Sequence, residues 1–320
     1  METVAGINRY RADDGPACGM RIAEVYTGAG LRYSILLDRG MDIGTASFRG
    51  VPVAFVGKGG IMRTDYALAC PEGFSQYFSA GLLTTCGLEN VGEPCEANGK
   101  LLRMHGSRTF LSAYDVCSSA DFEGNRYLIR VRGKMRCASL FGENILLTRE
   151  FVSGSESGEI EIHDTIENQG SVNYSYMLMY HVNFGFPLVS RDSCISTSHT
   201  EVFFLETTSI PEPALYQRFA SPCEKFSELT FEMRKPKEKQ VWARLENPHI
   251  GLQAVLRYDA ETLPCFTEWI NLAEQDYVLG LEPGTHYPIG RNKAEAAGIL
   301  VSLLPGERRE YSLRIDLNTL

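Results

Sequence analysis

Two ionisable side chains lie at the ends of apolar runs that read as buried strands. His181 follows the apolar residues of MLMYHVNFGFP, and Glu282 follows those of YVLGLEPG. An ionisable group is costly to bury unless it is partnered or used, and such groups gather at functional sites. Imidazoles and carboxylates are common general acids and bases in proton transfer. We therefore interpret His181 and Glu282 as the candidate catalytic pair.

The strands that carry this pair also predict which neighbours share its face. Side chains alternate along a strand, so Asn183 lies on the same face as His181, where the first run ends. Asn183 is therefore a candidate substrate-binding residue. In the second run, Gly280 shares a face with Glu282 and leaves room for a ligand to approach the backbone there.

Structural roles compete with catalysis for both residues. His181 could be a core histidine held by one backbone hydrogen bond. Glu282 could form a salt bridge with Arg291 or cap the turn at Pro283-Gly284. The two runs alone leave these alternatives open.

Polar residues in two glycine-rich segments form a further group of candidates. His105 and Arg108 follow apolar residues in GKLLRMHGSRTF, where glycines indicate tight turns and close approach. LDRGMDIG places Arg39 beside a turn, for which a turn held by Asp and Arg hydrogen bonds is an equal explanation. Neither segment has the spacing of a phosphate-binding loop. His286 follows Glu282 closely, and a use in the site stays open.

Composition and charge narrow the class of partner. The chain has 320 residues, 44% hydrophobic and 22% charged, with a net charge of -9. Nucleic acids and anionic membranes are bound by clustered Lys and Arg, so we expect neither as a partner. A neutral small molecule fits better. The sequence leaves the oligomeric state open, a homo-oligomer included.

The cysteines and the hydropathy of the chain indicate where in the cell the protein is found. The chain has nine cysteines, scattered along its length. An odd, scattered set in a long chain is typical of reduced thiols, and no spacing matches a zinc site, so we expect no metal. The first residues lack the features of a signal peptide, and no run approaches the roughly 20 apolar residues that span a bilayer. We expect a cytoplasmic protein.

Strand signals recur from end to end, whereas helix signals are scarce. Short runs rich in Val, Ile, Leu, Tyr and Phe alternate with turn residues, and the only helix candidates are short, at 65–70 and 293–297. No linker-like stretch divides the chain. The pattern predicts one all-β domain over residues 1–320, built as a large antiparallel sandwich with few short helices, and disfavours a doubly wound α/β fold.

Four segments together resemble one known superfamily. YHVNFGFP, the later LEP, the HG before the midpoint and the terminal LLPGE hairpin look like the aldose 1-epimerase (galactose mutarotase-like) superfamily. LDRGMDIG, GLLTTCGLENVG with MHGSR, and YHVNFGFPL resemble its DUF4432 branch more closely. The similarity runs from about residue 30 to the C-terminus. The usual Asn-His-x-Tyr-Phe-Asn-Leu pattern is replaced here by YHVNFG, and the usual substrate-binding aspartate has no evident counterpart.

The resemblance implies a β-supersandwich whose concave face holds a sugar. It implies that His181 protonates the ring oxygen and that Glu282 removes the proton of the anomeric hydroxyl. His105 matches a sugar-binding histidine near the ring oxygen, and Arg108 or Arg39 would supply a binding arginine.

The implied activity is a mutarotase that interconverts the α and β anomers of an aldose or related sugar without a cofactor. Ring opening of a hemiacetal needs one acid and one base. An ionised Glu282 beside a protonated His181 would supply both if each favours the charge of the other. A non-catalytic sugar-binding or sensing protein is the first alternative. A metal-dependent isomerase with His105, His181, His286 and Glu282 as ligands is the second.

Overall fold

The strands form two large antiparallel sheets and one small one. The computed structural model describes residues 3–65, 74–97, 99–205 and 216–320. The twelve-stranded sheet contains, in spatial order, β1 (Gly6–Arg11), β2 (Arg21–Tyr26), β3 (Leu31–Leu36), β4 (Asp42–Phe48), β6 (Leu83–Leu88), β13 (Tyr174–Gly185), β20 (Val278–Gly284), β19 (Cys265–Asn271), β16 (Leu229–Pro236) and β15 (His199–Phe204), with β5 (Val51–Pro52) on β4 and β21 (Val301–Leu303) on β13.

The second large sheet has eight strands. Their order is β14 (Cys194–Thr197), β17 (Gln240–Asn247), β18 (Leu252–Asp259), β22 (Arg308–Thr319), β12 (Glu159–Asn168), β11 (Asn144–Gly154), β10 (Arg126–Ala138) and β9 (Tyr114–Glu123). β7 (Cys95–Ala97) pairs with β8 (Lys100–Leu102). The helical pieces are η1 (Gly15–Ala17), α2 (Phe74–Tyr77), η2 (Arg108–Phe110) and α3 (Arg291–Ala296).

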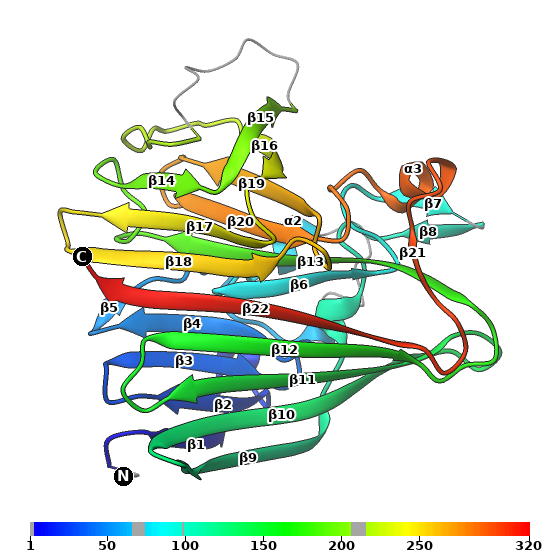
Figure 1. The fold of residues 1–320 in the computed structure, drawn as a ribbon, viewed down its shortest axis with the longest axis horizontal. Coiled ribbons are helices and arrows are strands. Elements are labelled where there is room, and N and C mark those ends of the chain that lie inside the picture. The colour runs from blue at the N-terminus through cyan, green and yellow to red at the C-terminus, as the bar shows by residue number, and fades with distance from the viewer. Residues whose placement is uncertain (1–2, 66–73, 98, 206–215) are drawn as a thin grey trace.

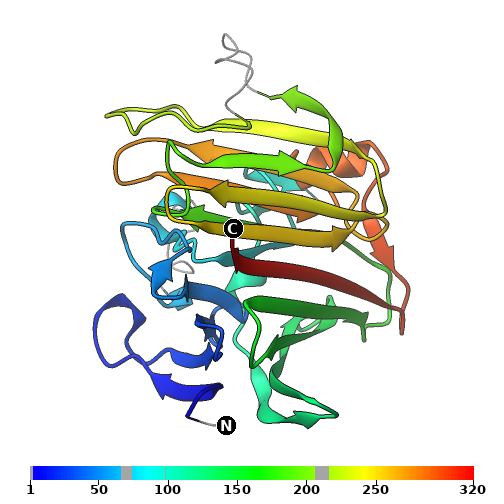
Figure 2. The ribbon, with the colours of Figure 1, turned by 60° about the vertical axis from the view of Figure 1, so that its left-hand side comes forward.

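The two large sheets are stacked as layers (Figures 1 and 2). The predicted all-β antiparallel sandwich is therefore confirmed. The short helix expected at 293–297 is present as α3, two residues earlier at its start. Most of the helix expected at 65–70 lies outside the described residues. No helix in the described ranges is long and apolar enough to cross a membrane.

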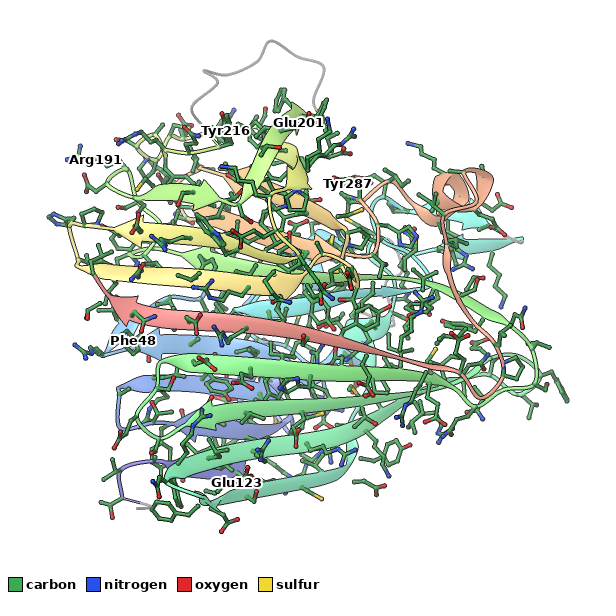
Figure 3. All side chains as sticks on the ribbon, in the orientation of Figure 1. Phe48, Glu123, Arg191, Glu201, Tyr216 and Tyr287 are labelled. Atoms are coloured by element: carbon green, nitrogen blue, oxygen red, sulfur yellow. The ribbon has the colours of Figure 1, made fainter. Side chains whose placement is uncertain are left out.

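Burial along the strands follows the position of each strand in its sheet. On β12 every second residue is buried, as expected for a strand with one face on the core. β13 is buried along its last ten residues, because it lies in mid-sheet between β6 and β20 and both its faces are covered. Side chains from both layers fill the space between them, and Phe48 of β4 is one of these (Figure 3). One continuous apolar core joins the two layers.

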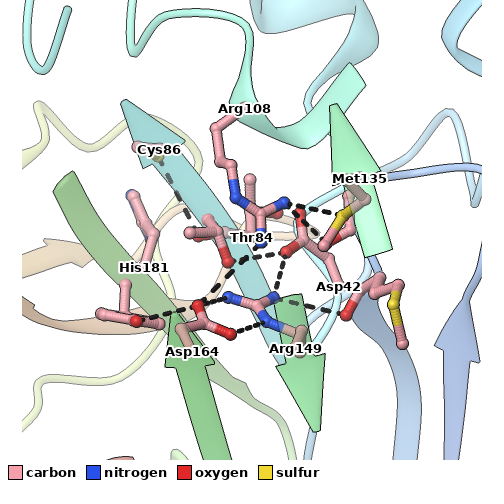
Figure 4. Close-up of polar contacts among 12 residues, drawn as sticks. Asp42, Thr84, Cys86, Arg108, Met135, Arg149, Asp164 and His181 are labelled. Atoms are coloured by element: carbon pink, nitrogen blue, oxygen red, sulfur yellow. Dashed lines mark hydrogen bonds and ion pairs between the residues drawn. The ribbon is translucent and has the colours of Figure 1, made fainter. Parts of the chain in front are cut away.

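A buried network of charged residues also joins the layers (Figure 4). Arg149 of β11 donates from Nε to Asp164 Oδ1 on β12 at 2.7 Å and from Nη1 to Asp42 Oδ1 on β4 at 3.0 Å. Arg108 lies alongside, with Nη2 4.0 Å from Asp164 Oδ2. All four side chains are at most 5% exposed. Two guanidiniums and two carboxylates thus balance each other in the interior.

Cysteines contribute no cross-link within the described ranges. The eight cysteines that the structure describes are all free thiols, and Cys70 lies outside those ranges.

Glu268 of β19 is a buried carboxyl group on the core face of the sheet. It is fully buried, and neither carboxyl oxygen has a hydrogen-bond partner among the described residues. Burial raises the pKa of Glu268 well above its ordinary value of 4.5. The group therefore enters the folded state as a neutral acid that loses its hydrogen bonds to water.

Replacing Glu268 by methionine should stabilise the protein, increasingly so as pH rises. Because the folded-state pKa is raised, the contribution of Glu268 to stability is fully present below its unfolded pKa and is lost as pH rises through the folded pKa. The unpaired group costs about 1–3 kcal/mol at neutral pH. Urea unfolding of both proteins from pH 5 to pH 9 measures this difference. A difference independent of pH, or equal to that of Glu310→Met at an exposed position of β22, would contradict it.

Candidate active site

His181 and Glu282 meet across a strand pair. In the antiparallel register of β13 and β20, Val182 lies opposite Leu281 and Asn183 opposite Gly280. The same register places His181 opposite Glu282, with both side chains on the outer face of the sheet. His181 Nε2 lies 3.1 Å from Glu282 Oε1, and the two side chains are 6% and 4% exposed. Residues about a hundred positions apart therefore form one contact pair.

This pair lies at the wall of a cavity of about 850 Å³, a size typical of small-molecule sites. The lining includes the aromatic residues Phe55, Phe74, Phe78 and Trp269, the histidines His105 and His181, and the charged residues Lys58, Glu93, Glu228, Asp276 and Glu282. Lys58 Nζ lies 2.6 Å from Asp276 Oδ2, so this cation is already neutralised.

Three aromatic rings surround the imidazole of His181. The ring centroids of Phe78, Trp269 and His105 lie 5.2, 5.5 and 5.9 Å from that of His181. Trp269 donates Nε1–H to Glu228 at 2.8 Å, which fixes the orientation of the indole. The arrangement presents an apolar ring face beside polar groups, as expected for a pocket that binds a ligand with both kinds of surface.

Gly280 lets these side chains converge. A Cβ at this position would lie 2.8 Å from Glu282 Oε1, 3.1 Å from Trp269 and 3.2 Å from the His181 ring. All three distances are shorter than ordinary van der Waals contact between heavy atoms. The absence of a side chain at Gly280 thus makes room for these three side chains, and the approach of a ligand to the backbone there stays a prediction.

Burial governs the protonation of the pair, because removal from water disfavours the charged form of either group. Burial lowers the pKa of His181 to about 3, with His105 adding to the effect and the Asn183 side chain opposing it. Burial raises the pKa of Glu282 to about 8, with the charge of Glu228 adding to the effect. Between these values the pair holds one proton. The ion pair expected from the sequence and the neutral pair differ only in where that proton lies, and burial favours the neutral pair.

The contact between His181 and Glu282 leaves one carboxyl oxygen unpaired. Glu282 Oε1 is close to the imidazole but is not aligned for a hydrogen bond, and it has no hydrogen-bond partner within the described part of the chain. The proposed salt bridge with Arg291 is not formed. Arg291 donates instead to the backbone carbonyls of Glu89 and Ser175. Glu282 is therefore a buried carboxyl group at a cavity wall, with Oε1 unpaired.

His105 reaches the same cavity from a loop. Its Nδ1 accepts the backbone N–H of Gly92 at 3.3 Å, and burial lowers its pKa to about 4. The neutral ring therefore carries its proton on Nε2. His105 has a φ of 55°, a left-handed conformation that costs energy for a non-glycine residue and is often found at functional sites.

The other candidate binding residues do not line this cavity. Asn183 is fully buried and donates Nδ2–H to the backbone carbonyls of Gly81 and His181. Arg39 donates to the backbone carbonyls of Met62 and Tyr77. Arg108 lies in the charge network between the sheets and donates to the Gly40 carbonyl at 2.8 Å.

The expectation that Arg39 or Arg108 reaches a ligand in this cavity is therefore not met by their placement. Each guanidinium is at most 2% exposed and serves the interior. Arg108 lies on the opposite side of the twelve-stranded sheet from the cavity. A single sequence does not distinguish an arginine that faces a ligand from one that bonds the interior, because either can stand beside a glycine in a turn.

The structure adds residues to the site that sequence reasoning missed. Trp269 and Glu228 approach the pair from β19 and from the residue that precedes β16, and Phe78 from the segment after α2. Trp269 stands in CFTEWIN, where alternation places it on the face opposite Glu268. Pairing of β19 with β20 brings it to Gly280, and that pairing has no local signal.

The metal-ligand set considered from the sequence is not assembled. Within the described ranges no group of three or more His, Cys, Asp or Glu side chains could hold a metal ion. His286 Nδ1 lies 2.8 Å from Thr285 Oγ1 and His286 Nε2 lies 3.0 Å from the Ile299 carbonyl oxygen. Both ring nitrogens are thus engaged away from the cavity.

Comparison with known proteins identifies the family. The model of the family described as "Domain of unknown function (DUF4432)" matches residues 17–317. The chain belongs to the DUF4432 family. A search of curated proteins finds no match to this DUF4432 protein.

Solved structures similar to this DUF4432 protein share its fold. A Klebsiella pneumoniae protein described as a "putative aldose 1-epimerase" is 22% identical with a TM-score of 0.88, over 97% of this chain and 83% of the other. A galactose mutarotase-like protein from Clostridium acetobutylicum is 13% identical with a TM-score of 0.67, over 99% and 100%. A galactose 1-epimerase from Lactobacillus acidophilus is 11% identical with a TM-score of 0.63, over 98% and 99%. The expected galactose mutarotase-like fold is confirmed.

Proposed function

We propose that this protein is a mutarotase that interconverts the α and β anomers of a free aldose or related sugar. The observation that carries the proposal is the contact of His181 with Glu282 at a cavity wall, in a pair that holds one proton near neutral pH. The similarity to proteins described as a "putative aldose 1-epimerase" and a galactose 1-epimerase supports it.

Mutarotation needs one proton to leave the anomeric hydroxyl while another reaches the ring oxygen. These two oxygens are bonded to the same carbon, so two catalytic groups side by side on one wall can reach both. His181 and Glu282 are placed in this way, rather than on opposite sides of a ring. No group outside the pair is required, because the proton that the sugar gains and the proton that it loses balance.

We assign His181 as the acid and Glu282 as the base. Hydrogen bonding of the anomeric hydroxyl to Glu282 favours the carboxylate and moves the single proton of the pair to His181. The carboxylate takes the hydroxyl proton while the imidazolium protonates the ring oxygen, and the bond between that oxygen and the anomeric carbon breaks. Rotation of the aldehyde and the reverse transfers give the other anomer. His105 would donate from Nε2 to a sugar oxygen near His181.

The test of this function is direct. Saturation-transfer NMR measures exchange between the anomers of hexoses, pentoses and uronic acids with and without the purified protein. Faster exchange of at least one sugar supports the proposal. Saturable sugar binding without faster exchange would replace it with a non-catalytic binding function, and no response to any sugar would remove both.

Mutarotase activity should fall as pH rises above about 8. The raised pKa of Glu282 marks the loss of the single proton of the pair, and without that proton no acid is present. Activity should be level from there down toward pH 3, where the lowered pKa of His181 marks the gain of a second proton. A kcat/KM profile for the fastest sugar, corrected for the uncatalysed rate, checks this. If kcat/KM already declines with rising pH below pH 6, the prediction is contradicted.

A further inference from the structure

The buried charge network touches β13, the strand that carries His181, and its neighbour β6. Tyr180 of β13 donates its hydroxyl to Asp164 Oδ2 at 2.9 Å. Thr85 of β6 donates its hydroxyl to Asp42 Oδ1 at 2.7 Å. Alternation places both side chains on the core face, opposite the cavity. The Tyr180 contact therefore acts on the inner side of the strand whose outer side carries His181, and the Thr85 contact acts on the inner side of the strand paired with it.

The residues held by the network adjoin His181 and its cross-strand partner in the chain. Tyr180 directly precedes His181, and Thr85 directly follows Thr84. Thr84 lies opposite His181 in the register of β6 and β13. The network thus fixes the strand at His181 and the strand next to it at the same level. Figure 4 shows His181 and Thr84 beside the network.

The same network holds the segment that carries His105. Arg108 donates from Nη1 to the Gly40 carbonyl at 2.8 Å and its Nη2 lies 4.0 Å from Asp164 Oδ2. Gly106, between the two residues, forms a bridge with Gly87 of β6. His181 is therefore next to Tyr180, which bonds to the network, and His105 is three residues from Arg108, which belongs to it.

We propose that the network of Arg149, Asp164 and Asp42 positions His181 for proton transfer, acting through Tyr180 and Thr85. This proposal rests on the proposed function. Hydrogen bonds to buried carboxylates are short and directional, so they hold the Tyr180 side chain and restrict rotation of the peptide that joins it to His181. A displacement of about 1 Å in a catalytic group can lower a rate by about 10²-fold.

This role also explains two charged residues, in segments singled out from the sequence, whose side chains do not reach the cavity. Asp42 belongs to LDRGMDIG and Arg108 to MHGSR. Buried ion pairs give little net stability compared with apolar packing, so four buried charges are a poor device for stability alone. Their hydrogen-bond geometry, in contrast, specifies one arrangement of the strands.

Tyr180→Phe tests the proposal against a matched control. Tyr176 lies on the same face of β13 and its hydroxyl bonds Tyr311 Oη at 2.5 Å, outside the network. Tyr176→Phe removes the same atom from the same strand. We expect Tyr180→Phe to lower kcat by about tenfold or more with KM unchanged, whereas Tyr176→Phe keeps its kcat. Thr85→Val should behave as Tyr180→Phe does, and serves if the first variant does not fold.

A second measurement is independent of activity. The side-chain ¹⁵N NMR signals of His181, assigned by their loss in His181→Asn, should shift in Tyr180→Phe and Thr85→Val and stay in place in Tyr176→Phe. If wild-type protein has no mutarotase activity, the proposed function fails while these shifts still test the positioning. Equal loss of kcat in the Tyr180 and Tyr176 variants, or unmoved His181 signals in both network variants, would overturn it.

Discussion

Replacing Glu282 by glutamine should lower mutarotase kcat/KM by about 10²- to 10⁴-fold, the usual contribution of one positioned acid or base. The amide cannot accept the proton of the anomeric hydroxyl. Because burial keeps Glu282 neutral near pH 7, glutamine replaces a neutral group of the same shape. The free energy of unfolding should therefore stay within about 0.5 kcal/mol of the wild-type value. Anomer exchange and urea unfolding of the same preparation separate the two effects.

His181→Asn should cause a similar loss, and the double variant should lose little more than either single variant. Acid and base act on one substrate in one step, so their contributions do not add. Glu310→Gln, at an exposed position of β22, is the control and should keep full activity. Activity above one tenth of wild type in Glu282→Gln would contradict the role of this carboxylate. Loss of folding in both site variants would favour the structural explanation of the pair.

Replacing Arg149 by methionine should destabilise the protein by about 3–5 kcal/mol, the typical cost of breaking a buried ion pair on one side. Arg149 is fully buried between Asp164 and Asp42, and its removal leaves two carboxylates in the interior. Burial alone would raise the pKa of Asp164, but Arg149 holds it below its ordinary value. Urea unfolding at pH 7 measures the loss.

The pH dependence gives this prediction a second check. A carboxylate with a lowered folded-state pKa stabilises the protein above its unfolded pKa and loses that contribution as pH falls through the folded pKa. Without Arg149 this contribution of Asp164 is absent, so the gap between variant and wild type should narrow below pH 4. Arg132→Met, at an exposed position of β10, should change stability by less than about 0.5 kcal/mol. If Arg149→Met lowered the free energy of unfolding as little as Arg132→Met, the stabilising role of Arg149 in the network would be contradicted.

Local pattern was sufficient for the fold class and for the candidate pair. Alternation of apolar residues is a property of neighbouring positions, so it predicted the strands, the antiparallel sandwich and the face that His181 shares with Asn183. The cost of an ionisable group in an apolar run pointed to His181 and Glu282 before any strand order was known. Gly280, with no side chain beside Glu282, was a third local signal.

Strand order and register were decided by the tertiary structure, because they depend on contacts between residues far apart in the chain. Pairing of β13 with β20 brought His181 to Glu282, and pairing of β20 with β19 brought Trp269 to the same wall. The same packing carried Arg108 to the core face of the sheet, away from the cavity. Burial then reversed the expected charge state of the pair, since the pKa of a group depends on the surroundings that the folded chain places around it.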